Sequence, residues 1–110
     1  MKDDKVYVDH ILLCLDRVAK YTASGHDAYL ADTMIQDAVI RNLQTLAEST
    51  MRLSDGFKAK CSQIDWKGIS SFRNVVVHEY LGLQLNEIWN VVVEDLPALK
   101  DCLAKNREKA

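Results

Sequence analysis

Four polar side chains suited to acid–base and phosphate chemistry fall close together in the sequence. Arg73, Asn74, His78 and Tyr80 surround three consecutive valines at positions 75–77. An imidazole titrates near neutral pH and can transfer protons. A guanidinium is always charged and can hold two phosphate oxygens at once. We therefore take this stretch as the candidate reaction centre, with Arg73 and His78 as its candidate catalytic residues.

These side chains could cleave RNA without a metal ion, because the 2′-hydroxyl of RNA can itself act as the nucleophile. The reaction needs a base, an acid and positive charge on the phosphate in the transition state. His78 suits either proton-transfer role, Arg73 suits the phosphate, and Asn74 could orient the imidazole or donate to the phosphate. The stretch contains a single histidine. The second proton-transfer group would be the His78 of another copy of the chain or a water molecule.

A helical reading of the stretch raises a geometric problem. At about 100° per residue, Arg73 and Tyr80 lie on one line of a helix, and Asn74 and His78 lie on a second line. Arg73 and His78 are then about 140° apart, which is awkward for two groups acting on one phosphate. Either the long side chains converge over a groove, or the second group comes from another subunit.

The pattern R-x-x-x-x-H-x-Y resembles the signature of the HepT toxins of the HEPN superfamily, which are small helical ribonucleases encoded beside a minimal nucleotidyltransferase antitoxin. Other segments resemble that family in order and spacing: Gln36-Asp37-Ala38-Val39-Ile40-Arg41-Asn42-Leu43, Asp65-Trp66, His78-Glu79-Tyr80-Leu81-Gly82, and Trp89 followed by Glu94-Asp95-Leu96-Pro97. The resemblance covers most of the chain.

The resemblance implies a cytoplasmic toxin that needs no cofactor and acts as a homodimer, in which two motif helices meet to form a composite Arg73/His78 site. It also implies that the partner nucleotidyltransferase attaches AMP to Tyr80, and that toxin and antitoxin could form a higher assembly. Such a modification would add bulk and negative charge, which would repel RNA and mask Arg73. The residues alone equally allow a structural Tyr80 that buries its ring and exposes its hydroxyl.

Two further questions stay open at the level of sequence. Arg41, Asn42 and Glu48 have the spacing to point at the motif helix and support the site, or they could form ordinary surface salt bridges. The chain could also be a catalytically inactive HEPN-type protein that binds nucleotides or serves as a scaffold for a nucleotidyltransferase.

Length and composition restrict the remaining possibilities. With 110 residues, of which 48% are hydrophobic and 27% charged, the chain has the size of one domain. Together with the resemblance, this implies a single HEPN-like helical domain over residues 1–110. No apolar run approaches a membrane span, and the N-terminus has no apolar signal segment, so we expect a cytoplasmic protein with no membrane partner. The histidines His10, His26 and His78 fall on separate elements without a carboxylate cluster, so no metal site is indicated.

Charge and cysteine content add two expectations. The net charge is −2, yet residues 51–73 carry five basic side chains against two acidic ones: Arg52, Lys58, Lys60, Lys67 and Arg73. This block could guide RNA toward the motif, although an ordinary solvated loop is the alternative. The odd number of cysteines, Cys14, Cys61 and Cys102, predicts reduced thiols that serve mainly in packing.

Hydrophobic periodicity predicts an all-α, up-and-down antiparallel four-helix bundle with a short additional helix or turn. The expected helices run from an N-cap at Asp3 or Asp4 to about Tyr21, from about Ala28 to Leu53, from an N-cap at Asp65 to about Gly82, and from about Asn86 onward. Their inward-facing apolar side chains are expected to include Val6, Ile11, Cys14, Val18, Met34, Val92 and Val93. Pro97 should kink the last helix or open a new segment within it.

Overall fold

The computed structural model describes residues 2–74 and 82–110, which form helices joined by short turns, with no strand among them. His78 and Tyr80 lie outside the described residues. The elements in chain order are α1 (Lys2–Tyr21), α2 (His26–Ala31), α3 (Thr33–Arg52), α4 (Asp55–Ala59), α5 (Trp66–Ser70), the 3₁₀ turn η1 (Ser71–Asn74), α6 (Gly82–Asn90), the π-helical segment η2 (Val91–Asp95), α7 (Leu96–Asn106) and the 3₁₀ turn η3 (Arg107–Lys109).

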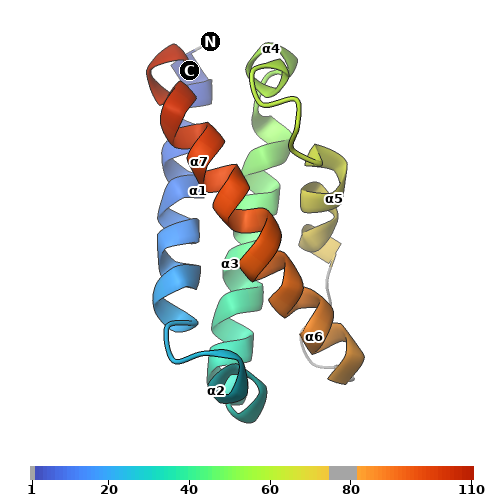
Figure 1. The fold of residues 1–110 in the computed structure, drawn as a ribbon. Helices are drawn as coiled ribbons and strands as arrows, with labels where there is room; N and C mark the ends of the chain where they lie inside the picture. The colour runs from blue at the N-terminus through green and yellow to red at the C-terminus, as the bar shows by residue number, and fades with distance from the viewer. Residues whose placement is uncertain (1, 75–81) are drawn as a thin grey trace.

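Two long antiparallel helices form the base of the bundle (Figure 1). Helix α1 runs beside α3, and the continuous rod formed by α6, η2 and α7 crosses both of them diagonally. Helix α5 and η1 flank α3 on the side away from α1. The two ends of the chain lie together, where Arg107 binds the Asp9 carboxylate through Nε at 2.6 Å. The predicted all-α bundle is confirmed.

The core forms because each main helix carries apolar side chains at three- and four-residue intervals. Side chains with no or almost no exposure line the contact of α1 with α3 and α7: Val8, Ile11, Cys14, Val18, Val39, Ile40, Leu43, Leu46, Leu99 and Leu103. Tyr29 and Phe57 from the short helices α2 and α4 close the two ends of this core. The core is therefore complete only when α1, α3 and α7 are packed together.

The predicted second helix is interrupted, in contrast to the sequence expectation of one helix from Ala28 to Leu53. Asp32 adopts an extended conformation, with φ −128° and ψ 110°, and its side chain accepts a hydrogen bond from the Met34 amide at 2.8 Å. Aspartate favours such N-cap positions because its carboxylate satisfies an amide that has no partner within the helix. Helix α3 therefore starts afresh at Thr33.

The predicted third helix begins as expected and then changes type. Asp65 caps α5, since its Oδ1 accepts from the Gly68 amide at 3.0 Å. The α-helix ends at Ser70 instead of continuing through Asn74, and η1 follows. The Ser71 hydroxyl donates to the carbonyl of Gly68, and such local bonds compete with regular α-helical pairing. The helix expected to end near Gly82 therefore includes a 3₁₀ turn, and α6 begins at Gly82.

The last predicted helix contains a π-helical segment at Val91–Asp95, directly before α7. Pro97 occupies the first turn of α7, where its missing amide hydrogen costs no helical hydrogen bond. The expectation that Pro97 opens a new segment is confirmed. The wider turn also changes which side chains face inward, so Val92 is buried whereas Val93, expected to face inward, is 47% exposed.

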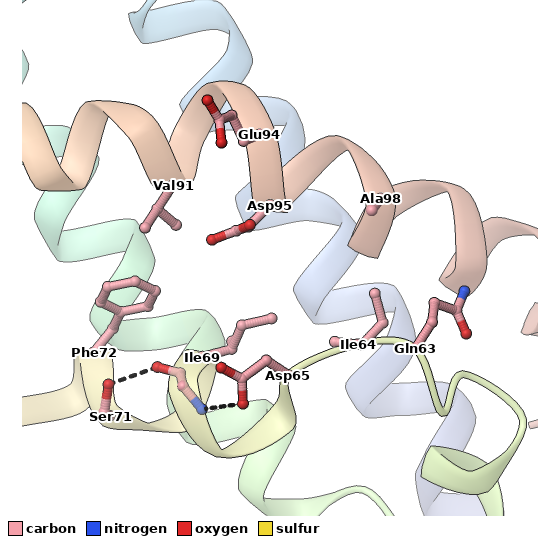
Figure 2. Close-up of a pocket in the computed structure, with 11 residues that line it drawn as sticks. Gln63, Ile64, Asp65, Ile69, Ser71, Phe72, Val91, Glu94, Asp95 and Ala98 are labelled. Atoms are coloured by element: carbon pink, nitrogen blue, oxygen red, sulfur yellow. Dashed lines mark hydrogen bonds between the residues drawn. The ribbon is translucent and has the colours of Figure 1, made fainter.

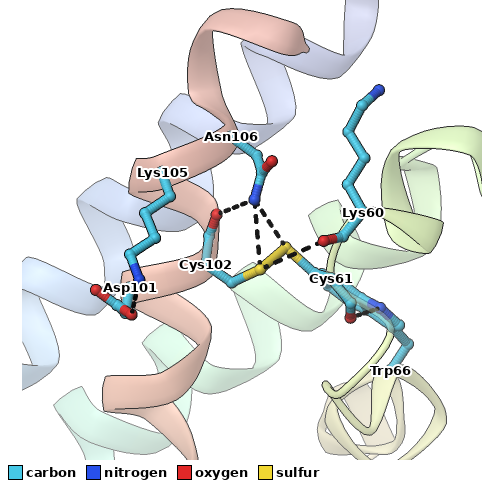
Figure 3. The surroundings of a disulfide bond; sticks show 7 residues. All are labelled: Lys60, Cys61, Trp66, Asp101, Cys102, Lys105 and Asn106. Atoms are coloured by element: carbon cyan, nitrogen blue, oxygen red, sulfur yellow. Dashed lines mark hydrogen bonds and ion pairs between the residues drawn. A yellow bond between two sulfur atoms is a disulfide. The ribbon is translucent and has the colours of Figure 1, made fainter.

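The expectation of reduced thiols is wrong for two of the cysteines. Cys61 and Cys102 form a disulfide across a sequence separation of 41 residues, and Cys14 is the free, buried cysteine. The bond forms because α7 passes over the turn that follows α4, a long-range contact with no local sequence signal (Figure 3). The Asn106 amide donates to the Cys102 carbonyl at 2.9 Å, and the Trp66 indole donates to the Cys61 carbonyl at 3.1 Å. The disulfide therefore anchors the segment that leads into α5.

A buried carboxylate ties the start of α1 to the start of α4. Asp4 is 6% exposed and accepts from the Ser54 amide at 2.8 Å and from the Ser54 hydroxyl at 2.6 Å. Ser54 in turn caps α4 through the Phe57 amide. Helix α1 already begins at Lys2, so Asp4 acts across the bundle and does not cap its own helix as predicted.

Candidate functional site

The candidate arginine lies on η1, at the edge of the bundle beside α3. Its side chain is 45% exposed. Its Nε is 3.9 Å from Oε1 of Glu48, and its Nη1 donates to the Met51 sulfur at 3.1 Å. Because η1 packs against α3 and follows directly on α5, the guanidinium is held near the surface with part of its fork open to solvent. The exposed ion pair of Arg73 with Glu48 is weak, so the guanidinium can exchange it for a stronger, bidentate contact with an incoming phosphate.

Of the other motif residues, Asn74 lies at the end of η1 and is exposed, one residue from Arg73. His78 and Tyr80 belong to the segment 75–81 outside the described residues. Their predicted roles in proton transfer and AMP modification therefore stay predictions.

The three residues predicted to support the site take different positions on α3. Glu48 contacts Arg73 and also pairs with Arg52, whose Nη2 lies 3.4 Å from its Oε2. Asn42 is buried, and its side-chain amide donates to the Ala38 carbonyl of its own helix at 2.9 Å. Arg41 is exposed to solvent. Glu48 is the member of this predicted set that meets the motif within the described part of the chain.

Met51 is a contact of Arg73 that sequence reasoning missed. It follows Glu48 by three residues, so the two side chains share a face of α3. At 44% exposed, it offers the guanidinium a soft thioether acceptor at the surface. An i, i+3 search from Glu48 could have found it, because any group that reaches Glu48 from a neighbouring element also meets Met51.

The predicted positive block maps onto adjacent elements. Arg52 ends α3, Lys58 and Lys60 belong to α4 and its C-cap, Lys67 lies on α5, and Arg73 lies on η1. The Lys58 ammonium lies 6.0 Å from the centre of the Trp66 ring, at the edge of the cation–π range. Helices α3 and α5 and η1 pack together in this part of the bundle. Four of these five cations are exposed, and Lys58 is half-buried.

A cavity of about 350 Å³ opens on the other side of η1, between α5 and η1 below and η2 and α7 above (Figure 2). Its lining is apolar on one part and acidic on another: Gln63, Ile64, Asp65, Gly68, Ile69, Ser71, Phe72, Val91, Glu94, Asp95 and Ala98. Since Ser71 and Phe72 immediately precede Arg73, this cavity adjoins the candidate site.

Two features are absent from the described part of the chain. In residues 2–74 and 82–110, His, Cys, Asp and Glu side chains form no group of three or more placed to hold a metal ion. Within the same ranges, none of the helices combines the length and the apolar character needed to cross a membrane.

The fold and the motif define a class of protein, namely an all-α bundle of the HEPN type with an exposed arginine at the motif. The family model described as "Ribonuclease HepT-like" matches residues 11–105, which include the whole stretch from Arg73 to Tyr80. The chain belongs to this family of ribonucleases, and the resemblance inferred from the sequence is confirmed.

Curated relatives carry related names. The "Gamma-glutamylcyclotransferase and putative RNase" of Methanocaldococcus jannaschii is 33% identical over 98% of this chain, and the chain spans 49% of that protein. A "Putative RNase" of the same organism is 31% identical over 87% of this chain and 80% of its own length. The "Probable ribonuclease HepT" of Thermococcus cleftensis is 28% identical over 97% of this chain and 98% of its own length. No solved structure matches the chain.

Proposed function

We propose that this chain is a metal-independent endoribonuclease of the HepT type and the toxin of a toxin–antitoxin pair. The observation that carries the proposal is the family match across residues 11–105, which includes a motif whose Arg73 lies exposed at the edge of the bundle. The exposed cations Lys60, Lys67 and Arg73 support RNA as the substrate, since a polyanion is drawn toward such a region.

In the proposed reaction, Arg73 binds the scissile phosphate with its guanidinium fork and stabilises the negative charge that develops there. His78 removes the proton of the 2′-hydroxyl or donates a proton to the leaving 5′-oxygen. Asn74, next to Arg73, donates to the phosphate or orients the imidazole. The 2′-oxygen bonds to phosphorus as the bond to the 5′-oxygen breaks, so the products are a 2′,3′-cyclic phosphate and a free 5′-hydroxyl.

A homodimer would supply the complementary proton-transfer group. One subunit offers a single motif histidine, whereas two motif segments meeting across a two-fold axis would offer two. Arg73 lies on a 3₁₀ turn that follows the α-helix ending at Ser70, so the angle of about 140° expected along one straight α-helix does not apply at Arg73. Modification of Tyr80 with AMP by a nucleotidyltransferase antitoxin would then silence the site through charge and bulk.

The test compares wild type, Arg73→Ala and His78→Ala proteins, each shown by mass to be unmodified, on labelled RNA in EDTA. We expect wild type alone to cleave and to leave cyclic phosphate ends. Arg17→Ala serves as the matched control, because it removes an exposed guanidinium from α1. Cleavage by all three proteins at similar rates would show that neither Arg73 nor His78 has the proposed catalytic role.

The alternative function is a non-catalytic partner of a nucleotidyltransferase. It is favoured by one observation, namely that Glu48 already pairs with the arginine that should hold phosphate. Equal inactivity of unmodified wild type and both variants, with RNA or nucleotide binding retained, would establish this alternative. Modification of Tyr80 by a nucleotidyltransferase encoded beside this chain would test the toxin–antitoxin part separately.

A further inference from the structure

We propose that the cavity beside η1 receives one nucleobase of the RNA, with guanine as the best fit, while Arg73 holds a neighbouring phosphate. This inference rests on the proposed ribonuclease function and assigns a substrate specificity to the same site.

The first argument is position. Successive residues of a 3₁₀ turn point about 120° apart, so Phe72 and Arg73 leave η1 in different directions. Phe72 faces the cavity, whereas Arg73 faces Glu48 and Met51 on α3. A base and its phosphate are likewise joined through a ribose and point in different directions. One nucleotide, or two adjacent ones, could therefore place a base on one side of η1 and a phosphate on the other.

The second argument is shape and apolar character. A volume of about 350 Å³ is at the small end of the range for ligand pockets, which suits one base with part of its ribose. Ile64 and Ile69 form the floor of the cavity, and Phe72 and Val91 face each other at one end (Figure 2). A flat heteroaromatic ring can stack on such surfaces, and aromatic side chains are the usual platforms for unpaired RNA bases.

The third argument is charge. Among the described residues, the lining contains Asp65, Glu94 and Asp95 and includes no lysine or arginine. Carboxylates repel phosphate, so the RNA backbone is excluded from the cavity and directed toward the cations on the Arg73 side. They accept hydrogen bonds from the N–H groups of a base edge. The cavity therefore favours a base whose edge carries hydrogen-bond donors.

Asp95 is the residue placed to read that edge. Its carboxylate points into the space between η2 and α5 and makes no capping bond to α7 (Figure 2). One oxygen of Asp65 is already occupied by the Gly68 amide. The π-helical turn that ends at Asp95 lies directly beside the cavity, and irregular turns of this kind often occur at functional sites.

Guanine fits a single carboxylate better than the other bases do. Its N1–H and N2–H groups are adjacent donors that the two oxygens of one carboxylate can accept together, in the same geometry as an arginine–carboxylate pair. Uracil flanks its single N–H with two carbonyl oxygens, which a carboxylate repels. Adenine and cytosine each offer one amino group next to a ring acceptor. An asparagine would reverse this preference, because an amide pairs with the donor and acceptor edge of adenine.

The experiment sequences the ends that wild type, Asp95→Asn and Phe72→Leu proteins produce from an RNA pool of random sequence in EDTA. We expect wild type to show guanine at one fixed position next to the cut. Asp95→Asn should lower that preference by about 5-fold to 150-fold and shift it toward adenine. Phe72→Leu should raise KM with little change in kcat, with circular dichroism confirming that the bundle is intact. Asp101→Asn is the matched control, since it removes an exposed carboxylate of α7 outside the cavity.

A binding measurement separates this inference from the proposed function. Guanosine monophosphate and uridine monophosphate are titrated into wild type and Asp95→Asn while the amide resonances of Gly68, Ile69 and Ser71 are followed. Stronger binding of the guanine nucleotide by wild type, lost in Asp95→Asn, supports the pocket even if no RNA is cut, in which case only the ribonuclease proposal fails. Cleavage without a base preference, or a preference unchanged in Asp95→Asn, overturns the pocket and leaves the ribonuclease proposal standing.

Discussion

Glu48 holds Arg73 at the surface, with 3.9 Å between the Arg73 Nε and the Glu48 Oε1. The same carboxylate pairs with Arg52 one helical turn further along α3, at 3.4 Å. One negative charge is thus shared by two guanidinium groups at the edge of the bundle. Under the proposed function, Glu48 would both orient Arg73 and compete with the phosphate for it.

Replacing Glu48 with glutamine should strengthen RNA binding. An exposed pair of this kind contributes about 0.2–1 kcal/mol, so we expect KM for RNA to fall by roughly 1.5-fold to 5-fold at low salt. The difference should shrink toward 1 M salt, where the Debye length is about 3 Å. Steady-state kinetics over a salt series measures it, with Asp101→Asn as a control for lost negative charge. A higher KM in Glu48→Gln would mean that orientation of Arg73 outweighs competition.

Replacing Arg73 with lysine separates charge from geometry. Lysine keeps the positive charge but lacks the planar fork that holds two phosphate oxygens. We expect KM to change little and kcat to fall by about 10-fold or more, because the lost contact matters most in the transition state. Separate determination of kcat and KM for Arg73→Lys and Arg73→Ala tests this expectation. A lysine variant with full kcat would show that charge alone is sufficient.

Removing the disulfide should destabilise the bundle strongly. Closing a loop of 41 residues lowers the entropy of the unfolded chain by an amount worth about 4 kcal/mol, so the Cys61→Ala/Cys102→Ala protein should unfold at clearly lower urea concentration. Adding a reductant should destabilise wild type similarly and leave the double variant unchanged. A wild-type midpoint insensitive to reductant would contradict this expectation.

Thiol labelling gives an independent check on the same bond. Burial raises the pKa of the Cys14 thiol, with Arg17 opposing the shift, so this thiol should react slowly in the folded protein. Unfolding without a reductant should expose one reactive thiol, and unfolding with a reductant should expose three. Three reactive thiols without a reductant would show that Cys61 and Cys102 are not joined.

Acid should weaken the link between α1 and α4. Burial raises the pKa of Asp4, but the hydrogen bonds from the Ser54 hydroxyl and amide outweigh it and hold the pKa below its usual value. A carboxyl group whose pKa is lower in the folded protein than in the unfolded chain adds stability at pH values above its unfolded pKa of about 3.9. This added stability disappears as the pH falls through the pKa of the folded protein. Asp4→Asn should therefore cost about 1–2 kcal/mol at pH 7 and less at pH 3, which lies below the unfolded pKa. Urea unfolding of both proteins at the two pH values provides the measurement, and a cost independent of pH would exclude the carboxylate charge as its origin.

Local patterns predicted the parts of the fold that depend on neighbouring residues. The buried positions Ile11, Cys14 and Val18, the cap at Asp65 and the new segment at Pro97 follow from spacing and capping chemistry. Other expected core residues, such as Val6 and Met34, are 64% and 79% exposed, because a helical stripe wider than the contact surface leaves its margin in solvent. The break at Asp32 was missed since the apolar repeat continues across it.

Long-range contacts limited the prediction of the site. The meeting of Glu48 with Arg73 was expected as one option because both positions could be placed on neighbouring helices. The disulfide between Cys61 and Cys102 and the cavity at Phe72 and Asp95 depend on the path of α7 over the turn after α4 and on the π-helical turn before it. Neither the disulfide nor the cavity is marked by a sequence periodicity or a short motif. Each could therefore be identified only from the three-dimensional structure.

The Asp9–Arg107 contact holds the N-terminal half of α1 beside the final turn η3, so the two ends of the chain could be joined by a linker. A short linker between the two ends would give a closed ring, and new termini could be opened in the turn around Gly25, where φ is +98° and no neighbouring atom would crowd a side chain. Such a circular permutant would keep α5 and η1 in place while moving the points at which a purification handle or a fluorescent reporter is attached.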